Sequence, residues 1–529
     1  MRTGSLLARM WHDGPRSVNH SWTAPEGTPS QEGVKMRARA ILLSISLLAG
    51  MATVGPEPVA AATPEERPDI IVILIDDMPG IDDRVLRRLP NIRTTFLEQG
   101  VRFTEFHGET PLCCPGRAGF LTGQHTHHHG VVKNTVRRFD QRMTIATQLD
   151  GVGYHTFHVG KYFNLYEAIA PSVPPGWDRF HALAPGKTGY AGYYEYDFWN
   201  NDSATPEHRG TLASDYSTDV IRGKTMFRLR QAPADRPLFA WISPYAPHSP
   251  TLPAPRHRTD TRCSSVPGWA PPHYNERDVS DKPAYVRNAR PLSAPAYDLR
   301  GVCRSLLAVD EMVGAIRLEL AAQARLGDTM LILTSDNGLN LGAHRLDRKS
   351  TPYSTRIPFM VSWPDRLGTQ GRTIAEPLSN IDLAPTLCKI AGCKMGPYPD
   401  GQTRADGVSF AGLLFGEISS LRRKEILQSS PLGHKPLDMP AWYGLRTTPS
   451  SGTAQKTCDD AASGGCRWQY VLYETGEEEL YDLSDGPCWR WTVGQPGDPC
   501  ALDDRAGDQA FEEIRSTLSG RLAKRLNEP

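Results

Sequence analysis

Residues 69–77 read DIIVILIDD, a continuous run of apolar and mostly β-branched side chains between acidic residues. Such a run is typical of a strand that is buried on both faces of a sheet. A second short apolar run, MLIL at 330–333, follows a segment at 303–325 whose apolar residues recur with a helical period. Buried strands that alternate with helices predict an α/β fold with a large, mostly parallel sheet sandwiched by helices.

Other segments indicate how the chain is divided. Residues 238–243 (LFAWIS) predict a further strand, which the prolines of 246–250 end. Residues 249–298 are rich in Pro, Arg, Ser and Ala and have only a weak pattern, which is typical of a functional or mobile segment. Short strands are expected at 468–473 and 479–483. We therefore expect a main domain over 66–420 and a smaller C-terminal α+β domain over 421–529.

Composition restricts the class of protein. The chain has 529 residues, of which 39% are hydrophobic and 22% charged, as in ordinary globular proteins. Its formal net charge is zero, so the overall charge does not indicate nucleic acid or a membrane surface as a partner. Any binding of an anion must therefore depend on local groups of charges.

The N-terminal segment predicts export. Within residues 36–62, Arg37 and Arg39 form a basic region, residues 40–54 are largely apolar, and residues 59–62 have small side chains. This order is typical of a secretory signal peptide, which is too short for a stable membrane span. Residues 1–35 are interpreted as a non-native extension before a start at Met36. An uncleaved membrane anchor is the alternative to a secreted or extracytoplasmic protein.

Export changes the interpretation of the ten cysteines. Cys113 and Cys114 are adjacent and are set aside. The others are Cys263, Cys303, Cys388, Cys393, Cys458, Cys466, Cys488 and Cys500. An even number in an oxidising compartment indicates disulfides. Close spacing suggests the pairs 388/393, 458/466 and 488/500, although the sequence does not fix the connectivity.

Residues 113–123 read CCPGRAGFLTG, a C-x-P-x-R pattern followed by L-T-G. This stretch resembles the signature of the sulfatase family, C-x-P-S/A-R-x-x-x-L-T-G, with Gly116 at the position of the usual Ser or Ala. In that family a formylglycine-generating enzyme oxidises the cysteine to an aldehyde in the unfolded chain. The resemblance therefore implies that Cys113 becomes formylglycine. The alternative is a buried pair of free thiols at a strand–helix turn.

Acidic residues follow both buried runs. Asp76 and Asp77 come after the first, and Asp336 and Asn337 come soon after the second. In open α/β sheets, ligands bind at the carboxyl ends of the strands. Adjacent carboxylates repel each other unless a cation neutralises them, and oxygen ligands of this kind suit Ca²⁺ or Mg²⁺. For Asp76 and Asp77 alone, a solvated strand end is the alternative.

The resemblance covers about residues 66–485 and implies a role for each member of the site. The positions that bind the metal in the family match Asp76, Asp77, Asp336 and Asn337, with the formylglycine of Cys113 completing the set. The positions that act on the nucleophile or the sulfate match Arg117, Lys161, His248 and Lys349. His344 is a possible additional residue on the substrate side.

Three features narrow or complicate this resemblance. The pair Cys113-Cys114, the KYFN stretch at 161–164 and the APHSP stretch at 246–250 resemble the N-acetylglucosamine-6-sulfatase branch. Phe163 stands where many sulfatases carry a histidine, and the acidic residue usual after Tyr353 is missing. The histidines at 125 and 127–129 could form a zinc site, but the resemblance places them among structural or substrate-side residues.

The chemistry of a hydrated aldehyde suits the cleavage of a sulfate ester. One of its two hydroxyls attacks sulfur, and the second then expels sulfate. The expected enzyme is an exported sulfatase that acts on a sulfated carbohydrate, another sulfated small molecule or an aryl sulfate, and that has no nucleic acid partner. The alternatives are a phosphonate monoester or phosphodiester hydrolase with the same nucleophile, and a non-catalytic metal-containing binding protein.

Overall fold

The computed structural model describes residues 67–80, 83–186, 192–200, 203–398, 401, 404–433, 435–448, 467–483, 488–490 and 498–528. The predicted extension at 1–35 and the signal peptide at 36–62 lie outside these residues, as do Cys458 and Cys466. Residues 62–529 form one compact unit, so the predicted domain boundary near 421 stays a prediction.

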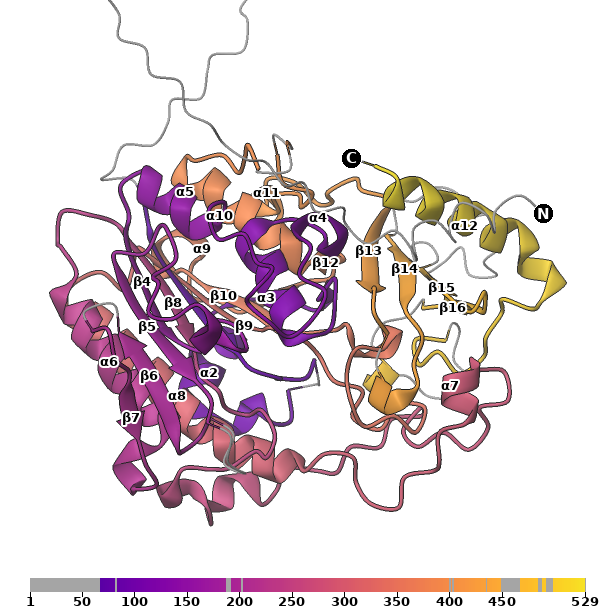
Figure 1. Ribbon diagram of the computed structural model, residues 1–529, viewed down its shortest axis with the longest axis horizontal. Helices are drawn as coiled ribbons and strands as arrows, with labels where there is room; N and C mark the ends of the chain where they lie inside the picture. Colours follow the sequence, from indigo (N-terminus) through magenta and orange to yellow (C-terminus); the bar gives the residue numbers. More distant parts are fainter. Residues whose placement is uncertain are drawn as a thin grey trace, which may run out of the picture. The chain divides into compact units, whose positions relative to one another are not determined.

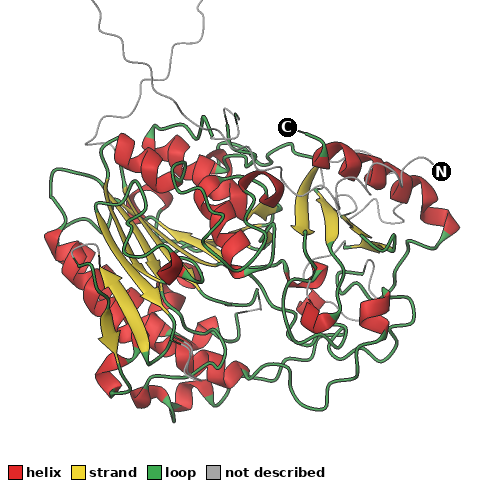
Figure 2. Cartoon of the chain, in the orientation of Figure 1, coloured by secondary structure: helices red, strands yellow, loops and turns green. Residues whose placement is uncertain are grey.

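A 10-stranded mixed sheet organises the chain (Figures 1 and 2). Its central strands are parallel, because β9, β1, β8, β4 and β5 pair in this order with the same direction. Antiparallel pairs occur toward both edges, where β10 joins β9 and β6 joins β5. The strands in spatial order are β11 (Arg372–Ile374), β2 (Val101–Phe103), β10 (Phe359–Ser362), β9 (Thr329–Ser335), β1 (Asp69–Ile75), β8 (Leu238–Ser243), β4 (His155–Gly160), β5 (Arg179–Ala184), β6 (Tyr196–Asn200) and β7 (Glu207–Arg209).

Helices cover both faces of this sheet (Figure 1). Ile70, Val72 and Leu74 of β1 face a core shared with α3, α5, α10 and α11, whereas the alternate residues of β1 face a core shared with α6 and α8. The helices are α2 (Pro90–Ile92), α3 (Cys113–Thr122), α4 (Thr126–His129), α5 (Ile145–Gly151), α6 (Ser217–Gln231), α7 (Ala284–Arg287), α8 (Leu299–Ala322), α9 (Pro364–Leu367), α10 (Leu383–Ala391), α11 (Ala411–Phe415) and α12 (Glu512–Leu526). The predicted α/β class with a sandwiched, mostly parallel sheet is confirmed.

The C-terminal part contains a separate antiparallel sheet. Its strands are β13 (Glu425–Ser430), β14 (Trp442–Thr447), β15 (Trp468–Tyr473) and β16 (Glu478–Asp482), in this spatial order. α12 lies against this sheet through an apolar stripe that includes Leu518 and Leu522 (Figure 1). The small α+β region expected at this end is therefore present, and both strands expected from the sequence are found within one residue of their predicted bounds.

Some predicted elements differ in their limits. The expected helix at 303–325 begins four residues earlier and ends three residues earlier, because Asp298 accepts a hydrogen bond from the backbone of Arg300 and starts α8. Residues 249–298 contain only short 3-10 turns and α7, in agreement with their weak pattern. A short sheet of β3 (Phe106–His107) and β12 (Leu378–Ser379) was not predicted.

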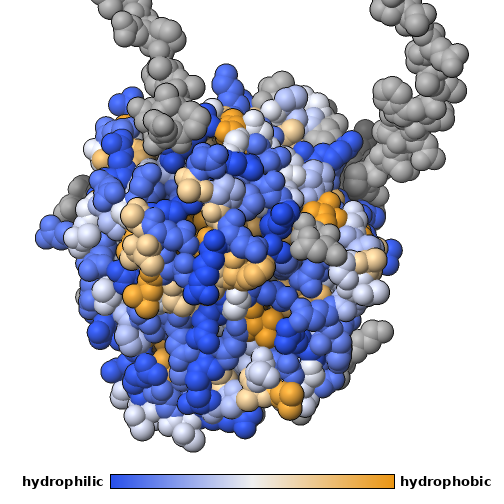
Figure 3. Space-filling model, turned by 90° about the vertical axis from the view of Figure 1, so that its left-hand side faces the viewer, coloured by the Kyte–Doolittle hydropathy of each residue, from blue (hydrophilic) through white to orange (hydrophobic). Residues whose placement is uncertain are grey.

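The structure contains the disulfides expected between Cys388 and Cys393 and between Cys488 and Cys500, and it also joins Cys263 to Cys303. Cys113 and Cys114 are free and buried. Among the helices of the described residues, none has the length and apolarity needed to span a bilayer. The face at the left of Figure 1 is mainly hydrophilic with scattered apolar residues (Figure 3).

Candidate active site

The two acidic pairs meet at one edge of the large sheet. β1 and β9 are adjacent and parallel, with Ile75 opposite Ser335, so the residues that follow each strand emerge at the same level. The backbone N–H of Asp77 donates to Asp336 Oδ1 at 3.1 Å, and the side-chain amide of Asn337 donates to Asp77 Oδ1 at 2.7 Å. Asp76, Asp336 and Asn337 are fully buried. The structure thus brings together the acidic residues that the strand pattern places at this edge.

The first turn of α3 places Cys113, the predicted nucleophile, at this edge of the sheet. Cys113 is the first residue of the helix, and its Sγ lies 3.8 Å from Asp76 Oδ1. Arg117, one turn later, donates from Nε to Asp336 Oδ2 at 2.9 Å and from Nη1 to the carbonyl of Lys161 at 2.6 Å. Its Nη2 is buried, lies 3.9 Å from Asp76 Oδ1 and has no hydrogen-bond partner. Arg117 therefore presents an unsatisfied donor toward the carboxylates beside Cys113.

Two lysines complete the arrangement. Lys161 follows the end of β4, and its Nζ lies 2.6 Å from Asp76 Oδ2 with no exposure to solvent. Lys349 Nζ lies 2.5 Å from Asp77 Oδ1, 3.1 Å from Cys113 Sγ and 3.3 Å from Asn337 Oδ1. Both ammonium groups therefore lie against the carboxylates, and Lys349 also contacts the position that the sequence predicts for the nucleophile.

His248 approaches from a loop beyond β8. Its Nε2 lies 3.5 Å from Asp77 Oδ2, and its Nδ1 lies 2.7 Å from the carbonyl of Ser249. Because a carbonyl oxygen only accepts, Nδ1 carries a proton in this contact. The side chain is 24% exposed, whereas that of Lys161 is fully buried. His248 thus lies on the open side of the site.

The electrostatics of the site follow from burial and crowding. Burial alone would raise the pKa of Asp76, but Lys161, His248, Arg117 and Lys349 together hold it well below its usual value. The pKa of Asp336 is raised instead, first by burial and then by the charge of Asp76. Burial also raises the pKa of the Cys113 thiol to about 12, despite both lysines. The unmodified thiol therefore stays protonated at neutral pH and is a poor nucleophile.

The donor chemistry fits a hard divalent cation. Asp76, Asp77, Cys113 and His248 offer ligand atoms that all lie within 4.8 Å of one another. This geometric group includes His248 instead of Asp336, whose two oxygens accept from Arg117 and from the backbone of Asp77. Ca²⁺ and Mg²⁺ prefer carboxylate and amide oxygens, which Asp336 and Asn337 supply, over the imidazole nitrogen of His248. Asp336 and Asn337 therefore stay in the predicted metal set.

The other histidines singled out in the sequence lie apart from these contacts. His344 is buried and lies 2.6 Å from Glu276 Oε2, with its ring beside Tyr353. His128 pairs with Asp406 at 2.8 Å. Among the described residues, the histidines at 125 and 127–129 do not form a group with ligand atoms within 4.8 Å of one another. The structure thus offers no support for the alternative of a zinc site there.

One contributor, Tyr245, was not recognised in the sequence, and the packing role of Gly116 was not predicted. Tyr245 is buried between two site residues, with its ring centre 5.5 Å from Lys161 Nζ and 4.8 Å from the His248 ring. Its only sequence signal is its place three residues before His248. Gly116 packs so closely that a Cβ there would lie 2.2 Å from the backbone oxygen of Asp336. The absence of a side chain at Gly116 therefore lets α3 pack closely against the backbone of Asp336, a predicted metal ligand.

Comparisons with known proteins identify the family to which the chain is related. Residues 68–393 match the family model described as Sulfatase. An arylsulfatase from Volvox carteri is 28% identical over 505 residues, covering 83% of this chain and 74% of its own length. An N-acetylglucosamine-6-sulfatase from Capra hircus is 29% identical over 493 residues, covering 88% of this chain and 84% of its own length.

The fold has solved counterparts as well. One is a protein in complex with its substrate D-glucosamine-2-N,6-O-disulfate, which superposes with a TM-score of 0.66 at 21% identity and covers 88% of this chain and 99% of that chain. At this level of identity the likeness shows a shared fold.

Proposed function

Since this chain belongs to the sulfatase family and is a sulfuric ester hydrolase, we propose that it removes sulfate from carbohydrates by means of Cys113 oxidised to formylglycine. The observation that carries the proposal is the position of Cys113 Sγ, which lies 3.1 Å from Lys349 Nζ and 3.8 Å from a buried carboxylate. This sulfur stands where an oxygen of formylglycine would lie. As a hydrate, formylglycine supplies a hydroxyl that attacks sulfur and a second that allows sulfate to leave.

We propose Ca²⁺, with Mg²⁺ as the alternative, as the cation held by Asp76, Asp77, Asp336, Asn337 and the modified Cys113. When bound, it would polarise the sulfate oxygens and lower the proton affinity of the nucleophile. Three buried carboxylates that repel one another support this assignment, since a divalent cation bound among them would relieve the repulsion.

The chain's own cations have separate tasks in this proposal. Arg117 aims its unsatisfied Nη2 at the carboxylates beside Cys113 and holds the nucleophile in place. Lys161 and Lys349 lie on either side of the site and stabilise the negative charge that develops on the transferring group.

His248 is the proposed proton donor to the leaving oxygen. Lys161 is fully buried against Asp76, so it does not reach an outgoing group. Burial would lower the pKa of Lys349, but Asp77 and neighbouring charges raise it well above its usual value, so this lysine keeps its proton. His248 is the most exposed of the three side chains, and because its Nδ1 proton points to the carbonyl of Ser249, it would donate from Nε2 as the doubly protonated imidazolium.

The proposed substrate is a sulfated sugar, in particular 6-O-sulfated glucosamine. The supporting features are the KYFN and APHSP stretches, the similarity to an N-acetylglucosamine-6-sulfatase, and the sulfated glucosamine named for a protein of the same fold. The chain is proposed to be exported, since residues 36–62 have the pattern of a signal peptide. Its maturation would require a formylglycine-generating enzyme.

The test is a comparison of kcat/KM for 6-O-sulfated glucosamine, an aryl sulfate and a phosphodiester with one enzyme preparation. We expect the sulfated sugar to be the best substrate. Fastest turnover of the phosphodiester would contradict the proposed sulfatase activity. Turnover of the aryl sulfate alone would keep the reaction class and remove the sugar from the proposal.

A further inference from the structure

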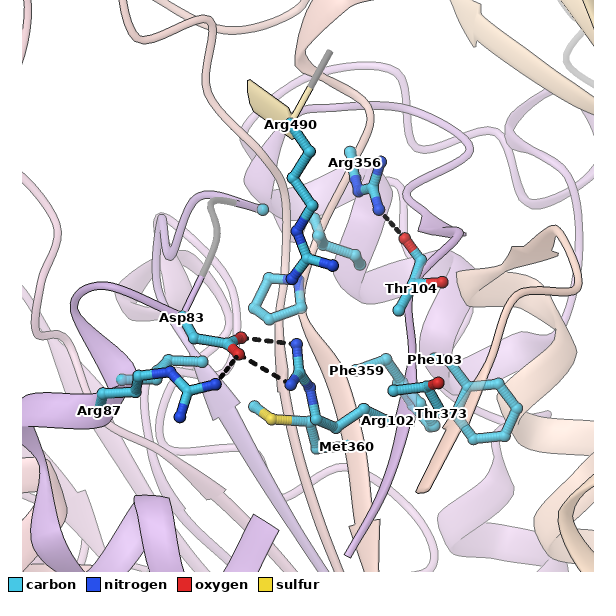
Figure 4. A pocket seen from close by; sticks show the side chains of 14 residues that line it. Asp83, Arg87, Arg102, Phe103, Thr104, Arg356, Phe359, Met360, Thr373 and Arg490 are labelled. Atoms are coloured by element: carbon cyan, nitrogen blue, oxygen red, sulfur yellow. Dashed lines mark hydrogen bonds and ion pairs between the residues drawn. The ribbon is translucent and has the colours of Figure 1, made fainter. Parts of the chain in front are cut away.

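A second cavity lies beside the edge strands of the large sheet, outside the group around Cys113. It has a volume of about 380 Å³, which is within the range of ligand pockets. Its wall combines residues of β2, β10 and β11 with Arg490 from the C-terminal part (Figure 4). Arg490 is distant in sequence from all three strands, so the cavity forms only when the chain folds.

Arginines dominate the polar lining of this cavity, which we call the arginine pocket. Arg87, Arg102, Arg356 and Arg490 line it, and among the lining residues that the structure describes Asp83 is the one with an acidic side chain. Arg102 binds Asp83 through two hydrogen bonds, and Arg87 donates to the same carboxylate at 3.0 Å (Figure 4). One carboxylate thus neutralises only one of two guanidinium groups.

A second group of charged side chains lies behind the pocket. Glu105 pairs with Arg356 at 3.0 Å and with Arg446 at 2.8 Å, so a single carboxylate again faces two guanidinium groups. Burial lowers the pKa of Arg356, and the positive charges of Arg446 and Arg467 lower it further although Glu105 opposes them. Among the described residues, Arg87, Arg102 and Arg490 thus line the pocket around the single carboxylate of Asp83, which leaves an excess of about two positive charges for an anion.

The remaining lining suits a sugar. Phe103, Phe359 and Met360 provide apolar surface, and Thr104 and Thr373 provide hydroxyl groups. The C–H faces of a saccharide can pack against the apolar side chains, and its hydroxyls can form hydrogen bonds with the two threonines. A guanidinium binds a sulfate or carboxylate substituent through paired hydrogen bonds, as it does other planar or tetrahedral oxyanions.

The arginine pocket connects with the loops of the catalytic site. A smaller cavity of about 110 Å³ shares Gly80 and Arg356 with it and is also lined by residues 339–341 and His344. Gly80 lies three residues after Asp77, and residue 339 lies two after Asn337. The two cavities therefore adjoin each other beside the segments that follow the predicted metal ligands, and this arrangement offers a path from those segments to the arginines.

We propose that the arginine pocket binds a second anionic sugar unit of the substrate, so that the enzyme acts on a sulfated oligosaccharide extending from the Cys113 site along this path. The inference rests on the proposed function in one respect, namely that the ligand is a sulfated saccharide. It assigns to Arg490 and Arg87 a role in binding the extended chain and no role at the reacting sulfur.

The test uses the double variant Arg87→Ala/Arg490→Ala, because both side chains are largely exposed and Asp83 keeps Arg102 as a partner. The control is Arg179→Ala on β5, an exposed arginine that lies on the far side of β1 from β2 and β10. Two substrates are compared: a hexasaccharide containing 6-O-sulfated glucosamine, and the 6-O-sulfated monosaccharide, which is too short to fill both sites.

We expect the KM of the double variant for the hexasaccharide to rise about tenfold, because a charge-assisted hydrogen bond is worth about one power of ten in affinity. Its kcat/KM for the monosaccharide should stay within about twofold of the wild type. The variant Arg87→Lys/Arg490→Lys should have a KM for the hexasaccharide between those of the wild type and the double alanine variant, because lysine keeps the positive charge. Equal KM values in the double variant and in Arg179→Ala would overturn the proposal.

A direct measurement separates this inference from the proposed function. Calorimetry with the wild-type protein compares the sulfated hexasaccharide with the same chain after desulfation. Binding that requires sulfate and weakens in the double variant supports the arginine pocket even if no sulfated sugar is turned over, an outcome that would contradict only the proposed function. Equal binding of both chains, or equal affinity in wild type and double variant, would overturn the pocket assignment.

Discussion

Two buried groups of charges in this molecule look alike but differ in kind. The first, the Cys113 cluster, contains Asp76, Asp77, Asp336, Arg117, Lys161 and Lys349 around the thiol. The second, the Glu105 cluster, contains Glu105, His107, Arg356 and Arg446. Carboxylates crowd one another in the first, whereas a single carboxylate is surrounded by partners in the second. The comparison teaches that crowding of like charges, more than burial of charge, distinguishes the proposed catalytic site.

The two clusters also join different parts of the chain. The Cys113 cluster draws on the ends of β1, β9 and β4 and on the start of α3, so it lies at the carboxyl edge of the large sheet. The Glu105 cluster links the segment between β2 and β3 to Arg446 on β14, in the C-terminal sheet. We expect substitutions in the first to affect turnover and substitutions in the second to affect stability. The predictions below are arranged by their expected effect on turnover.

The largest loss is expected for Asp77→Asn. The amide has the shape of the carboxylate, so the fold should persist, but the site loses one of three negative charges and a proposed metal ligand. We expect kcat to fall at least about a thousandfold, since a bound metal contributes several kcal/mol to the transition state. Metal content by mass spectrometry and kcat on an aryl sulfate check this. Retention of kcat together with loss of metal would show that turnover does not depend on the cation.

A smaller loss is expected for Lys161→Ala and for His248→Ala. Each should lower kcat by about a hundredfold to a thousandfold and change KM by less than about threefold, because both groups act on charge that develops in the transition state. The matched comparison is Lys224→Ala, which removes an ammonium that pairs with Glu207 away from the site. A change confined to KM would assign Lys161 and His248 to ground-state binding instead.

Gly116→Ala tests whether the close approach of α3 to the Asp336 loop matters. The substitution restores a small residue that is usual in the family motif, yet its Cβ would lie 2.2 Å from the backbone oxygen of Asp336. We expect a loss of about 1–3 kcal/mol in stability and a decrease in kcat of about tenfold, as for overpacked sites. Gly223→Ala in α6, where a Cβ meets no atom within 4 Å, is the control. Higher activity in Gly116→Ala at unchanged formylglycine content would contradict the packing argument.

The smallest effect on turnover is expected for Glu105→Gln. The substitution removes the carboxylate with which both Arg356 and Arg446 pair in a largely buried place. Such a break costs about 3–5 kcal/mol, so the unfolding midpoint in urea should fall clearly while kcat stays within about threefold of the wild type. A large loss of kcat without a change in the midpoint would contradict the assignment of the Glu105 cluster to stability and of the Cys113 cluster to turnover.

Much of the Cys113 cluster could be predicted from the sequence, for a physical reason. Strands buried on both faces appear as continuous apolar runs, and Asp76, Asp77, Asp336 and Asn337 stand at or close after the ends of two such runs. Cys113 and Arg117 lie one helical turn apart in a short motif. Such short patterns therefore predict both the strand or helix that carries a residue and the chemical role of that residue.

The remainder depends on contacts between distant segments. β2, β10 and β11 have three or four residues each, too few to show a period. β14 contains Gly444, a poor strand residue, and was not predicted. Asp83, Arg102, Arg356 and Arg490 meet only because these short edge strands pair, so no linear pattern could indicate the arginine pocket.

The central claim is that Cys113 acts only after oxidation to formylglycine. Its most direct test is mass spectrometry of the tryptic peptide of residues 103–117 from active enzyme, with kcat measured on the same preparations. The account predicts a peptide that is lighter because sulfur and two hydrogens leave and one oxygen enters, and a kcat that rises in proportion to this form. Full activity in a preparation whose peptide carries only unmodified, alkylatable Cys113 would contradict it.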